Sequence, residues 1–125
     1  MSLTQLQSSK FPRRLREIND PPKKLYLRGE MPPEDFKWLC VVGSRKYTNY
    51  GKDACETLIA GLAGLPVIIV SGLALGIDSI AHKSALKAGL KTVAVPGSGL
   101  NPNVLYPATG KGLAEEIVKS GGALI

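Results

Sequence analysis

Three turns rich in glycine and serine carry the residues that could bind an anionic ligand. They are 43–46, 71–78 and 97–99, and each follows a short apolar run typical of a buried strand. If these runs are parallel strands, the three turns meet at one edge of the sheet, where open α/β sheets bind ligands. Small residues let a backbone approach a ligand closely, and free N–H groups at helix starts favour anions. The pattern therefore predicts a phosphate-binding edge.

Basic side chains in and near these turns could supply the positive charge. The Arg45 guanidinium could fork onto a phosphate, although a solvated position or an ion pair with Asp53 or Glu56 would suit it equally well. Lys83 and Lys87 are one helical turn apart and could follow a phosphate backbone, or simply line a solvated helix face. The complete candidate site is Gly43, Ser44, Arg45, Lys46, Ser71, Gly72, Gly76, Lys83, Lys87, Gly97 and Ser98.

Other polar residues have simpler interpretations. Asp78 is placed to cap the helix that begins at residue 79. His82 is the only histidine, and we expect it to face away from the sheet. Tyr106 could stack on a base or pack its loop against the edge. Because no carboxylate pair, Cys/His cluster or nucleophile–base pair emerges, the residues favour a binding protein over an enzyme, without a metal or cofactor.

Known nucleotide-binding fingerprints are absent from these turns. Residues 42–45 lack the G-x-G-x-x-G spacing, and no G-x-x-x-x-G-K-[ST] sequence occurs anywhere in the chain. A nicotinamide, flavin or P-loop nucleotide site is therefore disfavoured.

The composition is typical of a globular domain whose positive charge favours encounter with polyanions. The chain has 125 residues, is 44% hydrophobic and carries a formal charge of +6, which favours encounter with nucleic acid. The first residues lack the apolar core of a signal peptide. Cys40 and Cys55 have neither metal nor redox spacing, so we expect buried thiols in a reducing, cytoplasmic compartment.

The chain divides into a Pro-rich lead-in, residues 1–37, and a regular core, residues 38–125. We expect disorder at 1–9, a helical turn or two within 11–18, and an extended segment at 25–27. In the core, strands at 38–42, 67–70, 92–95 and from 123 alternate with helices at 49–63, 79–88 and 111–119. This alternation predicts a parallel sheet with right-handed crossovers.

Local signals refine these helices. Thr48 is the expected N-cap of the first, and Gly89 and Gly121 are placed to end the second and third. The expected buried residues of the first helix are Tyr50, Ala54, Leu58 and Ile59 or Leu62; those of the second are Ile80, Ala81, Ser84, Ala85 and Ala88; those of the third are Leu113, Ala114 and Ile117.

One segment, residues 58–77, is uncharged and long enough to span a bilayer. Its glycines and Pro66 instead divide it into a helix end, a Val/Ile strand and a turn. We therefore expect no membrane association.

Taken together, the turns resemble the DNA-processing protein A family, known as DprA or Smf. The matching motifs run in the family's order over nearly the whole chain: Phe11-Pro12, Asp20-Pro21-Pro22, Leu25–Gly29, Val42–Lys46, Ser71–Asp78, Ala81-His82, Gly97–Leu100, Tyr106-Pro107 and Gly121–Ile125. Gly110 and Pro96 depart from the family pattern, which usually has Asn and an aliphatic residue there. The family pattern continues past the position of Ile125, so we expect a sheet that is incomplete at the C-terminus.

The resemblance implies an extended Rossmann-like, three-layer fold that binds single-stranded DNA without sequence preference. It also implies a role in natural transformation, in which family members protect incoming DNA and pass it to the RecA recombinase. Carried over by position, the family's DNA pocket falls on residues 43–45, 71, 72 and 76 and on the region of Lys83.

Two alternatives remain open at this point. One is a nucleotide-binding or nucleoside-monophosphate-hydrolysing enzyme of a related Rossmann-like group, although its catalytic Glu is missing near these turns. The other is an inactive fragment. If the sheet ends at the fourth strand, that strand has a bare edge, which would favour self-association.

Overall fold

The computed structural model describes residues 3–125, and the disorder expected for residues 1 and 2 lies outside them. A six-stranded sheet has the order β1-β2-β6-β5-β4-β3. Its strands are β1 Thr4–Leu6, β2 Leu25–Gly29, β3 Lys37–Cys40, β4 Val67–Ser71, β5 Lys91–Ala94 and β6 Ala123–Leu124. The α-helices are α1 Arg13–Arg16, α2 Asn49–Ala60, α3 Ile77–Lys87 and α4 Lys111–Lys119, and short 3-10 turns lie at Ser8–Lys10 and Ala108–Gly110.

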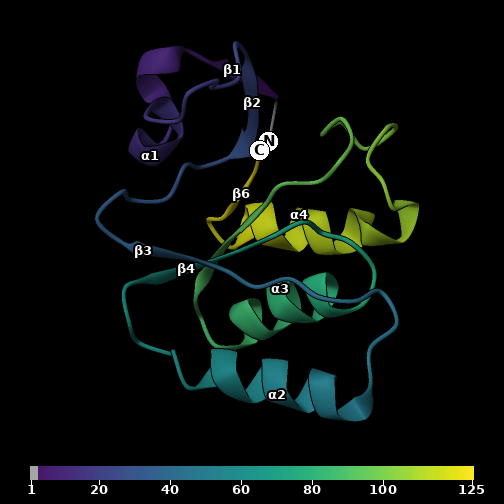
Figure 1. Ribbon diagram of the computed structural model, residues 1–125. Coiled ribbons are helices and arrows are strands. Elements are labelled where there is room, and N and C mark those ends of the chain that lie inside the picture. The colour runs from purple at the N-terminus through teal and green to yellow at the C-terminus, as the bar shows by residue number, and fades with distance from the viewer. Residues whose placement is uncertain (1–2) are drawn as a thin grey trace.

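The core of the sheet is parallel, as predicted. β3 pairs with β4, β4 with β5 and β5 with β6, all in the parallel sense. Because each crossover between neighbouring parallel strands is right-handed and runs in the same direction, α2, α3 and α4 all cover one face of the sheet (Figure 1). The α/β, Rossmann-like fold expected from the sequence is confirmed.

The lead-in extends this sheet with antiparallel strands. β2 pairs with β6, and β1 pairs with β2 over Thr4–Leu6. The expectation of disorder at residues 4–6 is therefore wrong. A short polar run has little strand propensity of its own, but β2 offers it a row of backbone hydrogen-bonding partners. The fourth strand is also not a bare edge, because β2 covers it.

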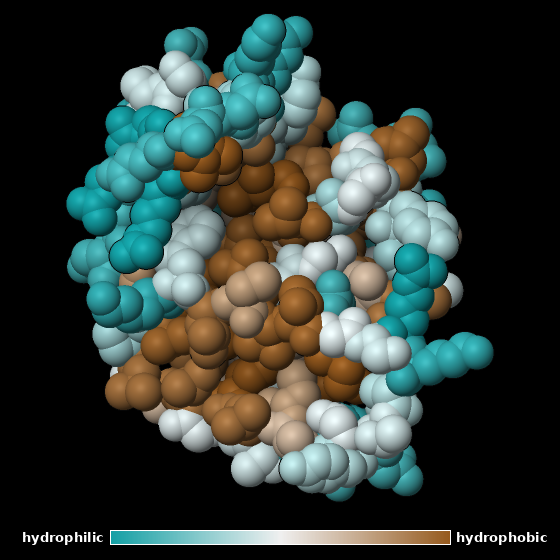
Figure 2. Space-filling model, viewed as in Figure 1, coloured by the Kyte–Doolittle hydropathy of each residue, from teal (hydrophilic) through white to brown (hydrophobic). Residues whose placement is uncertain are grey.

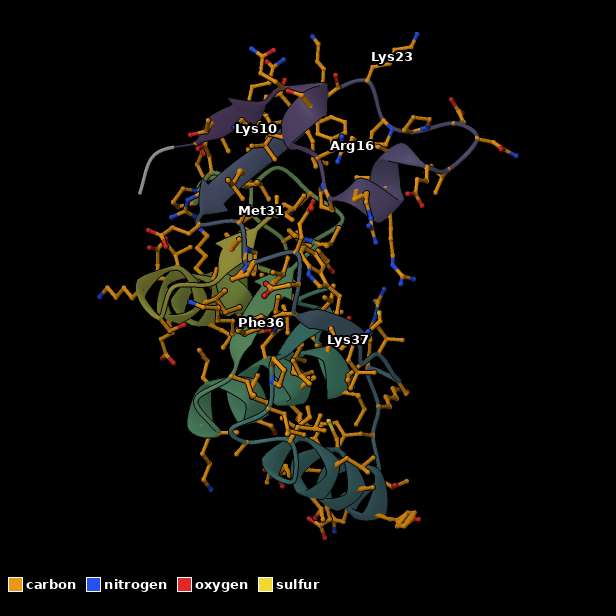
Figure 3. The ribbon with its side chains drawn as sticks, turned by 90° about the vertical axis from the view of Figure 1, so that its left-hand side faces the viewer. Lys10, Arg16, Lys23, Met31, Phe36 and Lys37 are labelled. Atoms are coloured by element: carbon orange, nitrogen blue, oxygen red, sulfur yellow. The ribbon has the colours of Figure 1, made fainter. Side chains whose placement is uncertain are left out.

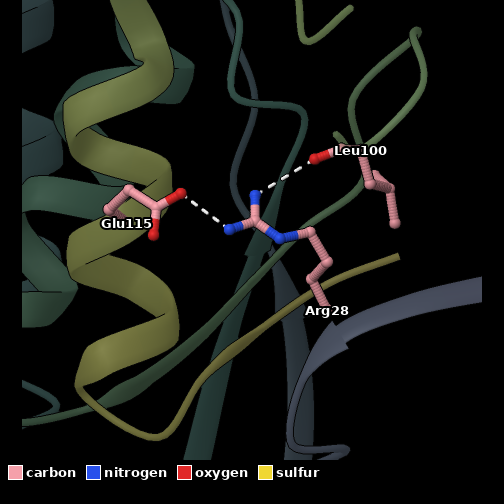
Figure 4. Close-up of polar contacts among 3 residues, drawn as sticks. All are labelled: Arg28, Leu100 and Glu115. Carbon is pink, nitrogen blue, oxygen red and sulfur yellow. Dashed lines mark hydrogen bonds and ion pairs between the residues drawn. The ribbon is translucent and has the colours of Figure 1, made fainter. Parts of the chain in front are cut away.

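A buried cation fixes the lead-in to the helical layer. Arg28 of β2 is 4% exposed. Its guanidinium donates to the Leu100 carbonyl at 3.1 Å and to a Glu115 carboxylate oxygen on α4 at 2.6 Å (Figure 4). The hydrogen bond from Arg28 lowers the pKa of Glu115. A guanidinium removed from water needs such partners, so β2, α4 and the loop at residue 100 are held together.

The predicted helix boundaries agree closely with the structure, whereas the buried face of α2 differs. The Thr48 hydroxyl accepts a hydrogen bond from the Gly51 N–H at 3.0 Å, which confirms the cap, and Gly89 and Gly121 follow α3 and α4 with positive φ angles. Residues Cys55 and Ile59 are buried on α2. Tyr50 and Leu58 are 78% and 72% exposed, so their predicted burial is wrong. α2 is the outermost helix and packs mainly against α3, which leaves it a narrow buried stripe.

The two cysteines lie in different environments. Cys55 is buried, as expected, and its burial raises the thiol pKa. Cys40 is exposed, so the expectation of a buried thiol is wrong there. β3 is the last strand of the sheet, and its outer side has no neighbouring strand.

His82 lies inside the protein, contrary to expectation. His82 is a residue of α3 that is 0% exposed and whose ring contacts Thr92 of β5. The Thr92 hydroxyl donates to the Ile69 carbonyl at 2.8 Å, so the His82 Nδ1–H donates to the Thr92 oxygen, 2.7 Å away. Nε2 has no hydrogen-bond partner among the described residues. Burial lowers the His82 pKa to about 4, so the ring is neutral in the folded protein at neutral pH.

The face of the sheet opposite α2–α4, called the open face below, is not covered by a long helix. Ile68, Val93 and Ala123 are buried on it under partly buried side chains that include Phe36, Trp38 and Ile125. Figure 3 shows α1 projecting on this side of the sheet, away from the three longer helices. A groove of about 1120 Å³ lies beneath it, and its apolar lining includes Leu15, Ile18, Phe36, Trp38, Val95 and Ile125. Figure 2 shows hydrophobic side chains gathered over the middle of this face.

The segment at residues 58–77 is divided as expected into the end of α2, strand β4 and a turn. From residue 3 to residue 125, no helix combines the length and the apolar character needed to cross a bilayer.

The buried His82 predicts a pH-dependent stability. Its pKa falls from an ordinary 6.5 to about 4 on folding, so the unfolded state binds the additional proton. The stabilisation is complete above pH 6.5, is lost as the pH falls towards 4, and amounts to about 3 kcal/mol. Urea unfolding of the wild type and of His82→Asn, which keeps a donor near Nδ1 but does not titrate, should give stability curves that converge with acidification. Parallel curves would contradict this assignment.

The open face and the free outer side of β3 predict self-association. Leu39 of β3 is 43% exposed, and Val42 just beyond it is 63% exposed, and such edges pair readily with another chain. Sedimentation velocity should show an average mass that rises with protein concentration. Leu39→Lys, which places a charge on this edge, should shift the equilibrium towards monomer. A wild-type mass that stays at the monomer value at every concentration would show that neither surface associates.

Candidate functional site

The first glycine turn lies directly against the second. Residues 43–46 follow the carboxyl end of β3 and are exposed. The Ser44 carbonyl accepts a hydrogen bond from the Ile77 N–H at 3.1 Å, at the start of α3. The Ser44 hydroxyl accepts from the Lys46 N–H at 3.1 Å and tightens the turn. The two turns that the sequence placed at one edge are therefore in contact.

Glycine is required where these turns meet. Gly76 has a φ of +82°, and a side chain there would collide with the carbonyl oxygens of Ser44 and Arg45. A Cβ at Gly43 would lie 2.8 Å from the Ile77 side chain. The glycines are thus explained by the close approach of two backbone segments, before any ligand is considered.

Asp78 joins the same two turns through its carboxylate. One oxygen, Oδ1, accepts from the Gly43 N–H at 3.3 Å, and the other, Oδ2, accepts from the Gly72 N–H at 3.1 Å. Asp78 lies in the first turn of α3, and the N-cap is Gly76, which has no side chain to bond. The predicted helix-cap role is therefore wrong. Local sequence favoured a cap because the partner, Gly43, is distant in the chain.

Ser71 differs from the other candidate residues because it is buried. Its side chain is 2% exposed, and its hydroxyl has no hydrogen-bond partner among the described residues. Its carbonyl accepts from the Val95 N–H at 2.8 Å. The hydroxyl is closed off from a ligand outside, so the Ser71 side chain offers no contact to one.

The third turn follows β5 and is closed by its own serine. The Ser98 hydroxyl accepts from the Tyr106 N–H at 2.9 Å and donates to the Gly99 carbonyl at 3.1 Å. The loop from 97 to 106 is therefore folded back on itself beside the edge. Gly97 is exposed, and Tyr106 is 66% exposed, so the structure leaves the ring accessible.

Three of the predicted cations are exposed. Arg45 and Lys46 lie in the first turn, and Lys83 lies on α3, which begins at the second turn. Within residues 3–125 the ion pairs are Arg13 with Glu17 and Arg28 with Glu115, so Arg45 does not pair with an acidic residue of α2.

Lys87 lies elsewhere. It is the last residue of α3, about 15 Å along the helix from the turn at a rise of about 1.5 Å per residue. The helix leads back to the opposite edge of the sheet, so the structure separates Lys87 from the other candidates.

Across 3–125, no group of three or more His, Cys, Asp or Glu side chains is arranged to hold a metal ion. The Asp78 carboxylate at the edge already accepts hydrogen bonds from two amides. Taken together, the edge has exposed backbone turns and free cations, and these suit binding of an anion.

Sequence comparison places the chain among DNA-processing proteins. It is 43% identical over 107 residues to the DNA processing protein DprA of Streptococcus pneumoniae, covering 86% of this chain and 37% of that protein. It is 38% identical over 115 residues to the protein Smf of Escherichia coli, covering 92% of this chain and 30% of that protein. The chain thus spans about a third of the length of these curated relatives.

Two solved structures have the same fold. The crystal structure of DprA from Streptococcus pneumoniae matches with a TM-score of 0.81 at 35% identity, over 98% of this chain and 42% of that chain. The DNA processing protein A of Helicobacter pylori, studied for its single-stranded DNA binding mode, matches with a TM-score of 0.79 at 32% identity, over 98% and 54%. The family model for DNA recombination-mediator protein A covers residues 2–125. The chain therefore belongs to the DNA recombination-mediator protein A family, also known as DprA or Smf.

Proposed function

We propose that this chain binds single-stranded DNA without sequence preference at the edge formed by its glycine turns. The observation that carries the proposal is the contact between the first two turns, which presents Arg45 and Lys46 to solvent with no acidic partner. Unpaired cations beside exposed backbone suit the phosphates of a flexible strand. The related Helicobacter pylori protein is described as binding single-stranded DNA.

The proposed contact set is smaller than the sequence suggested. It comprises the exposed turn 43–46, the backbone at Gly76, the side chain of Lys83, and the loop at 97–98. Gly72 is left out because its N–H already donates to Asp78. Phosphate contacts of this kind position a strand but do not read its bases. We therefore infer a non-catalytic binding role.

We place this binding in DNA uptake and RecA-mediated recombination in the cytoplasm. The family description, recombination-mediator protein A, supports the pathway. The relatives are much longer than this chain. Co-purification of this chain with RecA, in the presence and absence of single-stranded DNA, tests the partnership directly.

The proposed edge predicts a strong dependence of DNA binding on salt. If Arg45, Lys46 and Lys83 each neutralise a phosphate, the logarithm of affinity for an unstructured oligothymidylate should fall with the logarithm of salt concentration at a slope of about −2, or about −0.7 per contact. Fluorescence anisotropy titrations over a range of salt concentrations measure the slope. An affinity that does not change with salt would exclude phosphate contacts as its source.

Substitution of Arg45 tests the residue most central to this edge. Arg45→Ala should weaken binding to oligothymidylate and to mixed sequences alike, and should reduce the salt slope by about 0.7. Lys119→Ala removes one positive charge at the far end of α4 and serves as the matched control. Equal losses of affinity in the two variants would show that Arg45 acts only through the net charge of the protein. A loss confined to one sequence would indicate base readout instead.

A nucleotide-hydrolysing enzyme is the competing function. Incubation of the chain with nucleoside monophosphates, followed by chromatography, would reveal released base or phosphate. Turnover that is abolished by Arg45→Ala, in a protein without DNA affinity, would replace the proposed function.

A further inference from the structure

The Asp78 carboxylate occupies a place that an open α/β sheet commonly leaves to its ligand. In such folds, the amides at the carboxyl ends of strands and at helix starts bind the phosphate of a nucleotide. Here the corresponding amides of Gly43 and Gly72 donate to the two oxygens of Asp78 instead, at 3.3 and 3.1 Å. Asp78 is 7% exposed, so this anion is built into the protein.

Both amides already have an acceptor, so they are not available to a second anion while the carboxylate holds them. A Cβ at Gly72 would lie 2.8 Å from Asp78 Oδ2, so the carboxylate is seated directly against the turn. A phosphate approaching Gly43 or Gly72 would also meet a like charge that is largely removed from water, where repulsion is stronger than in solvent. A terminal phosphate, which carries up to two negative charges, is penalised more than a phosphodiester, which carries one.

We propose that Asp78 determines specificity at this edge by acting as an internal substitute for phosphate. It satisfies the amides that a mononucleotide phosphate would use, and it holds the first turn against the second. Binding is thereby confined to the outer surface, where Arg45 and Lys46 meet the diester phosphates of a strand. The last part of this inference rests on the proposed function, whereas the exclusion of a terminal phosphate does not.

The wild-type protein provides the first test. In a ¹⁵N-labelled sample titrated with millimolar inorganic phosphate, the amide resonances of Gly43 and Gly72 should stay in place, because Asp78 holds these groups. Resonances that shift and saturate would overturn the proposal without requiring any variant to fold.

The second test removes the charge and one of the two acceptors. The NH2 group of Asn cannot accept a hydrogen bond, so one of the two amides loses its partner. Asp78→Asn should bind inorganic phosphate and adenosine 5′-monophosphate more tightly than the wild type by roughly tenfold, the ratio that corresponds to one hydrogen bond to a charged group. Asp53→Asn is the matched control, because it removes the same charge from an exposed position on α2. Isothermal titration calorimetry gives the affinities, and thermal melting shows that the variants are folded.

The outcomes separate this inference from the proposed function. A folded Asp78→Asn that gains no more phosphate affinity than Asp53→Asn overturns the specificity role and leaves Asp78 as a structural link. Affinity for oligothymidylate is measured in parallel. If the wild type lacks it but Asp78→Asn gains phosphate binding, the proposed function fails while the exclusion of terminal phosphate stands.

Discussion

The pairing of the buried Arg28 guanidinium is the interaction on which the arrangement of the chain depends. Arg28 comes from the lead-in, yet it donates to α4 through Glu115 and to the loop after β5 through the Leu100 carbonyl. A guanidinium this deeply buried is costly unless its hydrogen-bonding groups are satisfied. Any arrangement in which β2 leaves the sheet would therefore cost free energy, because the buried Arg28 would lose its hydrogen-bond partners. By keeping β2 on β6, the pairing also fixes the loop that carries the third turn.

Opposed backbone segments, more than side chains, define the edge. The Ile77 amide bonds to the Ser44 carbonyl, and Gly76 provides the space for that approach. Because these contacts are internal, the edge is formed before a ligand arrives, which lowers the entropic cost of binding. The free cations then add attraction over a longer range than the amides can.

Periodicity and turn chemistry were sufficient to predict the elements of the core. The Val/Ile run at 67–70, the Thr48 cap and the limits of α4 agree with the structure because each depends on neighbours in sequence. The errors arise from partners distant in the chain. Residues 4–6 become a strand only against β2, and Cys40 is exposed only because no strand lies beyond β3. The buried His82 donates a hydrogen bond to the Thr92 oxygen on β5, ten residues away in sequence. The Asp78 carboxylate accepts from the distant Gly43 N–H and does not cap its own helix. At the edge, the spacing of the turns predicted which backbone segments meet. The burial of Ser71 and the distance of Lys87 from the turns could be seen only in the folded structure.

The position of β2 in the sheet has a consequence for how the polypeptide acquires its structure. β2 lies near the N-terminal end of the sequence, yet its partner β6 is formed by residues 123–124. Such a pairing has a high contact order, which slows folding because the loop between the partners must be closed first. During synthesis β2 can therefore pair with β1 early, but it cannot pair with β6 until residues 123–124 have been made. The helical units between β3 and β5 can assemble earlier, from contacts that are local in sequence.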